Sequence, residues 1–232
     1  TVDGHFHVAG AGSDVATMAL MGGARLTRAD LFGGQLTDAD VTIDIQNASL
    51  SGSYDGRLSD VNPALALDDQ RYDASLTGSG TGTISVRDLL VRSPQLADYH
   101  ITTQMMLESS RVRNIPLDSA TLNSTLDNGT LTVDEFHGAG PTIDLQATGR
   151  IEFDDSRSSQ IDYTITRGDL SLAKDLIGRD VSGNIATTGQ MTGPLSRVRL
   201  QGTGTLNRVE SSGLKVLAAE LTYGATVPAG AP

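Results

Sequence analysis

Apolar or small residues alternate with polar residues through most of the chain. In Ala120–Phe153, three alternating runs are separated by Asp127–Gly129 and by Gly138–Pro141. A period of two places successive side chains on opposite faces of a β-strand, and Asn-Gly is typical of a tight hairpin turn. This stretch therefore predicts a meander of strands, each with one apolar and one polar face.

The same alternation recurs elsewhere in the sequence. It covers residues 2–10, 41–46, 48–58, 72–86, 100–107, 161–165, 181–191, 198–206 and 221–227. Ser13–Met21 and Asp169–Ile177 are expected to be short helices, the second ended by Gly178, and Val61–Asp69 is expected to be a loop. We therefore predict an all-β fold, a long antiparallel sheet of strand meanders with two or three short helices.

Two segments of the chain resemble each other at the same offset. Leu36–Val41 is similar to Leu117–Leu122, and Asn47–Leu50 is similar to Asn128–Leu131; Val216–Leu221 resembles the opening of a third copy. We interpret 1–232 as one continuous segment with modules at 24–107 and 108–206 and the start of a third at 207–232. The alternative is that short Leu-x-x-Ala patterns recur by chance in a strand-rich chain.

The composition argues against some classes of function but does not assign one. The 232 residues carry a net charge of −11, which argues against nucleic-acid binding because phosphate neutralisation needs a basic surface. The absence of cysteine excludes disulfides and thiolate metal sites and is compatible with the periplasm. No apolar run reaches the roughly 18 residues of a membrane helix. Because the sequence starts at Thr1-Val2 inside an alternating run, we expect an internal segment of a longer protein.

No motif for catalysis is present. The glycine-rich Gly78–Gly82 is not followed at once by a helix-forming run, so a phosphate cradle is not indicated. His5 and His7 share one strand face, but a third histidine is not nearby, and His100 and His137 are expected to be isolated surface residues. We therefore predict no catalytic residue, no metal and no cofactor, and an enzyme is the least supported class of function.

The C-terminal half carries a recognisable order of short motifs. Gly189–Leu195 leads through Arg199-Leu200 into Gln201–Leu206, and Leu145–Ile151, Gly168–Leu170 and Val181–Ile185 lie upstream. This order resembles the AsmA-like family of Gram-negative envelope proteins, which includes TamB. The resemblance covers roughly residues 117–227 well and residues 6–86 more loosely.

The resemblance implies a curved antiparallel sheet folded like a taco, whose concave apolar face accepts lipid acyl chains. It also implies a periplasmic location in an inner-membrane-anchored protein, with the anchor outside this segment. Phospholipid and an outer-membrane protein are the implied partners, in lipid transport or in outer-membrane protein assembly.

Elementary physics leads to a similar expectation. About 14 strands with a spacing of about 4.8 Å make a sheet roughly 65 Å long, and a single apolar face must be covered by something. The residues predicted to line a lipid groove are Leu122, Leu126, Ile143, Leu145, Ile151, Phe153, Ile161, Tyr163, Ile165, Ile185, Leu200 and Leu206. The alternative is a structural β domain of an envelope or extracellular adhesin or scaffold, with a dry core, because it would show the same alternation.

Overall fold

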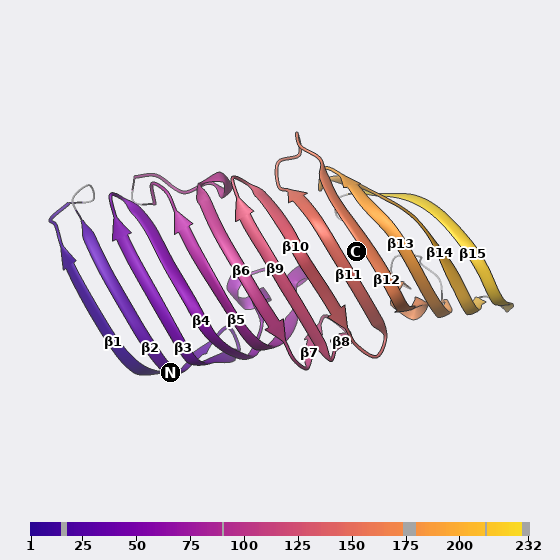
Figure 1. Ribbon diagram of the computed structural model, residues 1–232, viewed down its shortest axis with the longest axis horizontal. Coiled ribbons are helices and arrows are strands. Elements are labelled where there is room, and N and C mark those ends of the chain that lie inside the picture. The colour runs from indigo at the N-terminus through magenta and orange to yellow at the C-terminus, as the bar shows by residue number, and fades with distance from the viewer. Residues whose placement is uncertain (15–17, 90, 174–179, 212, 229–232) are drawn as a thin grey trace.

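The chain forms one open, curved antiparallel sheet in the computed structural model. The structure describes residues 1–14, 18–89, 91–173, 180–211 and 213–228. Within them, thirteen strands follow one another in chain order across the sheet, from indigo β1 to yellow β15 in Figure 1. The all-β prediction is therefore confirmed.

The strands along this path are long, and each pairs with its neighbours in an antiparallel register. They are β1 (Val2–Ala11), β2 (Ala19–Leu31), β3 (Gly34–Gln46), β4 (Ser49–Val61), β5 (Ala74–Val86), β6 (Tyr99–Leu107), β9 (Ser119–Asp127), β10 (Thr130–Ala139), β11 (Ile143–Glu152), β12 (Ser159–Asp169), β13 (Ser182–Gly193), β14 (Arg197–Ser211) and β15 (Leu214–Pro228). Twelve spacings of about 4.8 Å give a sheet about 58 Å long. Beside this path, β7 (Ser110–Val112) pairs with β5 and with β8 (Ile115–Leu117).

Tight turns connect several of the strands. Asn47 and Ala48 between β3 and β4 have φ of 50° and 61°, and Asn128 and Gly129 between β9 and β10 have φ of 49° and 75°. Two successive residues with positive φ are the geometry of the two-residue turn that matches the twist of a hairpin. The matching segments of the predicted repeat thus form the same kind of turn.

The N-terminal strands bend where β-bulges interrupt their ladders. The register shifts beside Thr27 on β2, at Asp38 on β3 and at Asp60 on β4; Asp38 and Asp60 have φ of 48° and 55°. An extra residue on one strand bends it and increases its twist. A small buried cluster, made of Leu26, Ala29, Leu36 and Ala39, packs along this bend.

A helical excursion from the sheet lies between β4 and β5. It contains the helix α1 (Pro63–Leu67) and a single 3₁₀ turn, η1 (Gln70–Tyr72), where a loop was predicted. Asn62 caps α1 by accepting the backbone N–H of Ala64 at 3.0 Å, and its side-chain amide donates to Asp73 at 3.0 Å. The predicted loop is therefore corrected to a capped helical turn that one asparagine joins to the start of β5.

The structure describes only parts of the two segments that were predicted to be helices. Of Ser13–Met21, residues 15–17 lie outside the described residues, and β2 already begins at Ala19. Of the second, Asp169–Ile177, Asp169 ends β12 and Leu170–Ala173 form the 3₁₀ turn η3, whereas residues 174–179 lie outside the described part. A further 3₁₀ turn, η2 (Leu96–Asp98), precedes β6. The prediction at Met18–Met21 was wrong because the glycines of β2 interrupt the alternation.

Arg92 forms a close ion pair with Asp98 in the loop before β6. Arg92 binds the carboxylate of Asp98 with both terminal nitrogens, at 2.7 and 2.6 Å, and the backbone N–H of Gln95 donates to the same carboxylate at 2.7 Å. These hydrogen bonds, that of Arg92 first, lower the pKa of Asp98 below its usual value. The paired charges fix the connection between β5 and β6.

The turn at Gly129 provides a clean test of the backbone geometry. A Cβ at Gly129 would meet no atom within 4 Å, so Gly129→Ala changes only the cost of a positive φ. We expect a loss of about 1 kcal/mol in the free energy of unfolding, measured by urea denaturation. Gly224→Ala is the control, because it also meets no atom within 4 Å but lies in β15. An equal loss in both variants would contradict the assigned turn.

Candidate functional site

The cross-strand register gathers the apolar side chains of the whole sheet on one face, which we call the apolar face. Residues that lie directly opposite each other in an antiparallel ladder point to the same side. One such row runs from Phe6 on β1 through Ala24, Val41 and Tyr54 to Gly82 on β5. The rows continue through β6 to β15, so the apolar face extends along the full path of strands.

Eleven of the twelve residues predicted to line a groove lie in strands of this face. The register pairs them across neighbouring strands in five rows. These rows are Leu126, Leu131 and Ile151; Leu122, Phe136, Ala147 and Tyr163; Leu145 and Ile165; Ile161, Met191 and Leu200; and Ile143, Gly168, Ile185 and Leu206. Phe153 is the exception. It lies one residue beyond β11, is 46% exposed, and is not part of a ladder row.

Within the described ranges, no second layer of strands covers the apolar face. Every strand in the described residues belongs to the one sheet, counting the short β7–β8 hairpin at its side. Most side chains of the face are half-buried by their neighbours, and towards β1 they become exposed, with Phe6 at 61% and Val8 at 71%. A continuous exposed apolar surface of this kind marks an interaction site in a folded protein.

The residues predicted to line a groove begin at β9 and do not include the N-terminal half of the face. Val41, Ile43, Tyr54, Ile84 and Ile101 lie in the same rows, reached through the ladders β3–β4, β4–β5 and β5–β6. Their signal was the same alternation that identified the C-terminal residues. The register shows that the two halves are one surface.

Near β15, two tyrosines cover two glycines in one cross-strand row. Tyr163, Gly189, Gly202 and Tyr223 are paired in that order across β12 to β15. A Cβ at Gly189 would lie 2.6 Å from the Tyr163 hydroxyl, and one at Gly202 would lie 2.8 Å from Cζ of Tyr223. The glycines therefore leave the space that the phenol rings fill.

The hydroxyl groups of these tyrosines form a chain of hydrogen bonds on the apolar face. Thr187, which is 6% exposed, donates to the Thr203 carbonyl at 2.7 Å, and its oxygen lies 3.0 Å from the Tyr223 hydroxyl. Because a carbonyl only accepts, Thr187 can only accept from Tyr223, and Tyr223 must accept from Tyr163 at 2.6 Å. Every hydroxyl proton is used, so this stretch of the face presents no free donor.

Burial and this hydrogen bond change the acidity of Tyr163. Burial is the larger cause that raises the pKa of Tyr163 above its ordinary value, and donation to Tyr223 adds to it. Burial also raises the pKa of Tyr54, whose hydroxyl is buried without a hydrogen-bond partner. Both phenols are therefore held neutral on the apolar face.

The opposite face is polar, and its side chains pair with one another. His100 Nδ1 lies 3.0 Å from an oxygen of Asp127, and His137 Nε2 lies 3.2 Å from one of Asp144. The prediction that these histidines are isolated is therefore corrected, because the register places an aspartate within reach of each. In the described residues, no group of three or more His, Asp or Glu side chains is arranged to hold a metal ion.

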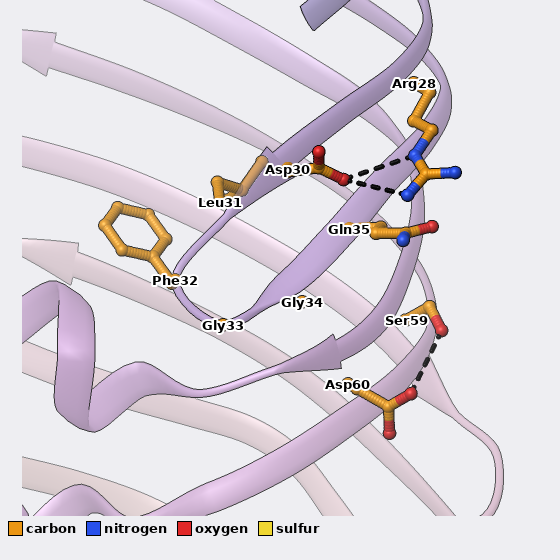
Figure 2. A pocket seen from close by; sticks show the side chains of 9 residues that line it. All are labelled: Arg28, Asp30, Leu31, Phe32, Gly33, Gly34, Gln35, Ser59 and Asp60. Atoms are coloured by element: carbon orange, nitrogen blue, oxygen red, sulfur yellow. Dashed lines mark hydrogen bonds and ion pairs between the residues drawn. The ribbon is translucent and has the colours of Figure 1, made fainter. Parts of the chain in front are cut away.

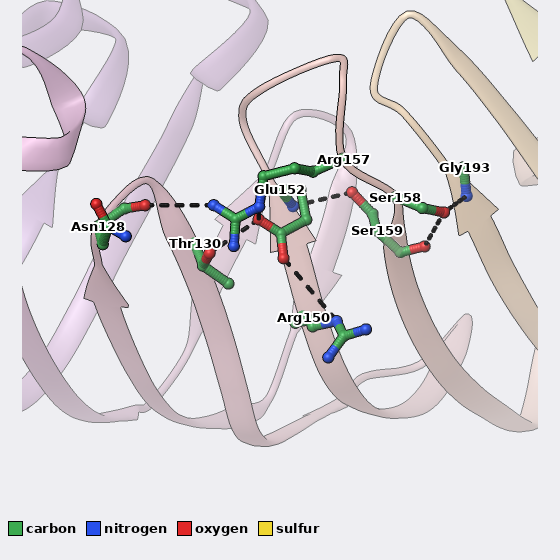
Figure 3. A network of polar contacts seen from close by, with 8 residues as sticks. All are labelled: Asn128, Thr130, Arg150, Glu152, Arg157, Ser158, Ser159 and Gly193. Carbon is green, nitrogen blue, oxygen red and sulfur yellow. Dashed lines mark hydrogen bonds and ion pairs between the residues drawn. The ribbon is translucent and has the colours of Figure 1, made fainter.

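A buried carboxylate joins the ends of β10, β11 and β12 (Figure 3). Glu152 accepts from the Thr130 hydroxyl at 2.8 Å and lies 3.1 Å from Nε of Arg157, and its backbone N–H donates to Ser159 at 2.9 Å. Arg150 adds a longer contact of 3.9 Å. Because the carboxylate is satisfied within the chain, we assign it a structural role.

A polar hollow of about 580 Å³ lies at the turn between β2 and β3 (Figure 2). Arg28 donates two hydrogen bonds of 3.2 Å to Asp30 beside it. Asp60 accepts from Ser75 at 2.9 Å and from Ser59 at 3.4 Å. The charged groups of this hollow are thus bonded within the chain, and we assign it no ligand.

Comparison of the chain with family models, with curated proteins and with solved structures finds no match. Among the helices of the described residues, none is long and apolar enough to cross a membrane. The candidate site therefore has to be interpreted from its own geometry, which is that of an extended apolar surface.

Two tyrosine substitutions should have different effects on stability. Tyr163→Phe removes a donor that is paired with Tyr223, so we expect a loss of about 0.5–1.5 kcal/mol in the free energy of unfolding. Tyr54→Phe removes a buried hydroxyl without a partner, so we expect no loss and up to about 1 kcal/mol of gain. Urea denaturation of both variants measures this, and a loss in Tyr54→Phe matching that in Tyr163→Phe would contradict the assigned hydrogen bonds.

The raised pKa of Tyr163 predicts a dependence of stability on alkaline pH. Above about pH 10 the unfolded chain loses the tyrosine proton while the folded protein keeps it, so stability falls as the pH rises. Thermal unfolding from pH 8 to pH 11 should show a steeper fall in the wild type than in Tyr163→Phe. Equal slopes in the two proteins would contradict a raised pKa at this residue.

Proposed function

We propose that this chain is a non-enzymatic segment of a lipid conduit that holds phospholipid acyl chains along its apolar face. The observation that carries the proposal is the apolar face, which is continuous across thirteen strands. In the described residues no second sheet covers it. Transfer of hydrocarbon from water onto such a surface contributes about 0.8 kcal/mol for each buried methylene group. The lipid headgroup would stay in water at the open side of the sheet.

The chemistry of the face favours hydrocarbon over a polar ligand. In the C-terminal half, the hydroxyls of Tyr163, Tyr223 and Thr187 use their protons within the chain. A polar ligand would find no free donor in that group and would lose its own hydration. Acyl chains make no such demand, and they gain contact with the side chains of the whole face.

We further propose the setting that the AsmA-like resemblance implies. The chain would be part of an inner-membrane-anchored protein that crosses the periplasm towards the outer membrane, in outer-membrane biogenesis. Its partners would be phospholipid and an outer-membrane protein. The absence of cysteine is compatible with this setting.

Cross-linking on β11 tests lipid binding directly. Leu145 lies on the apolar face, whereas its neighbour Gln146 is exposed on the polar face. A photoreactive residue at Leu145 should capture phospholipid when the purified chain is illuminated with vesicles, and intact mass spectrometry should detect the adduct. The same residue at Gln146 should capture little.

Two results would contradict the proposal. Equal capture at both positions would show that contact is independent of the apolar face. No lipid adduct at Leu145, together with a native mass spectrum of lipid-free protein, would favour the structural β domain with a dry core.

A further inference from the structure

The turn between β9 and β10 carries an asparagine followed by a glycine, Asn128 and Gly129, at an exposed tip. In the whole sequence, Asn128 is the only asparagine with a glycine after it. Asn128 is exposed, and the two residues have φ of 49° and 75°. A Cβ at Gly129 would meet no atom within 4 Å, so neither a side chain of its own nor a neighbouring group crowds the backbone at Gly129.

The connection that follows β11 holds this turn through its two carbonyl groups. Arg157 donates to the carbonyl oxygen of Asn128 at 3.4 Å (Figure 3), and the backbone N–H of Phe153 donates to that of Gly129 at 3.2 Å. Within the described residues, no hydrogen bond engages the side-chain amide of Asn128 or the backbone N–H of Gly129. These two neighbouring groups can therefore react with each other without first losing a hydrogen bond.

We propose that Asn128 is a site of spontaneous deamidation, with water as the co-reactant. The backbone nitrogen of Gly129 gives up its proton and attacks the side-chain carbonyl carbon of Asn128. The bond to the side-chain nitrogen breaks, ammonia leaves with that proton, and a five-membered succinimide ring forms. Water then opens the ring at one of its two carbonyl groups. The product is aspartate, or isoaspartate when the main chain continues through the side-chain carbonyl.

The related turn between β3 and β4 provides an internal comparison. Asn47 is also exposed, and Asn47 and Ala48 have φ of 50° and 61°, so the two turns have a similar backbone. Ala48, however, carries a Cβ and is only 5% exposed. Crowding beside its backbone nitrogen slows ring closure, so we expect the two turns to differ in reactivity although they share a backbone conformation.

The two products have different consequences for the sheet. Aspartate at position 128 adds a negative charge beside Asp127, which lies 3.0 Å from His100, and leaves the length of the main chain unchanged. Isoaspartate adds a carbon atom to the main chain of the two-residue turn that joins Asp127 to Thr130. Because the length of such a turn fixes the register of a hairpin, isoaspartate weakens the pairing of β9 with β10.

Peptide mapping of the purified chain tests the site. After incubation at mildly alkaline pH, cleavage on the N-terminal side of aspartate gives the peptide 127–133, which contains Asn128, and the peptide 44–54, which contains Asn47. Mass spectrometry should show conversion of Asn128 before any conversion of Asn47, and Gly129→Ala should prevent it over the same period. Equal conversion at Asn47, or conversion of Asn128 only when the chain is unfolded in urea, would overturn the proposal.

A matched pair of proteins separates the effect of charge from that of the main chain. Ion-exchange chromatography isolates the converted chain through its added charge, and aspartate at position 128 creates a further cleavage site that isoaspartate does not. The isoaspartate form and the variant Asn128→Asp then carry the same charge and differ in the main chain alone. Urea denaturation should give the isoaspartate form a lower midpoint than Asn128→Asp. Equal midpoints would overturn the effect on the hairpin.

Deamidation at Asn128 does not depend on lipid binding by the apolar face. Lipid capture at Leu145 without conversion of Asn128 would remove this site and leave the conduit. Conversion of Asn128 in a chain that captures no lipid would remove the conduit and leave this site.

Discussion

The register of the antiparallel ladders is the constraint on which the rest of the structure depends. Each strand alternates apolar and polar side chains, so pairing in the observed register puts most apolar side chains on one side. A slip of one residue in any ladder would turn the next strand over and place its apolar set on the polar face. The turns at Asn47-Ala48 and Asn128-Gly129 and the bulges at Asp38 and Asp60 set this register locally.

Glycine and tyrosine together shape the apolar face. Where a tyrosine lies over a paired glycine, as at Tyr163 and Gly189, the ring fills the space that the missing side chain leaves. Gly82 likewise lies opposite a tyrosine, Tyr54 on β4, and has Thr103 on its other side. Pairs of tyrosine and glycine thus recur on the apolar face, in both halves of the sheet, without any change in backbone topology.

The sequence predicts the strands and the apolar face well because both depend on a local period of two. The alternation identified β9 to β15 and most of the residues on their apolar face. The full length of β2 was not predicted, because Gly22 and Gly23 interrupt its alternation of apolar and polar residues. Pairing with β1 and β3 nevertheless makes this segment a strand. The contact between Tyr163 and Tyr223 joins residues 60 positions apart, so it depends on the register of three ladders and has no local signature.

An open sheet with one apolar face poses a problem of burial that folding alone does not solve here. In a β-sandwich the second sheet covers the apolar side chains, and the residues of both inner faces interdigitate. Here the strands of the described residues are all used in a single sheet, and the cluster around Leu26 and Leu36 buries only a small part of the apolar side chains. The side chains of the apolar face therefore stay partly in contact with water. An apolar occupant that covers them removes this surface from water, which favours its binding. Under the proposed function that occupant is an acyl chain, because it is long and apolar and needs no hydrogen-bonding partner.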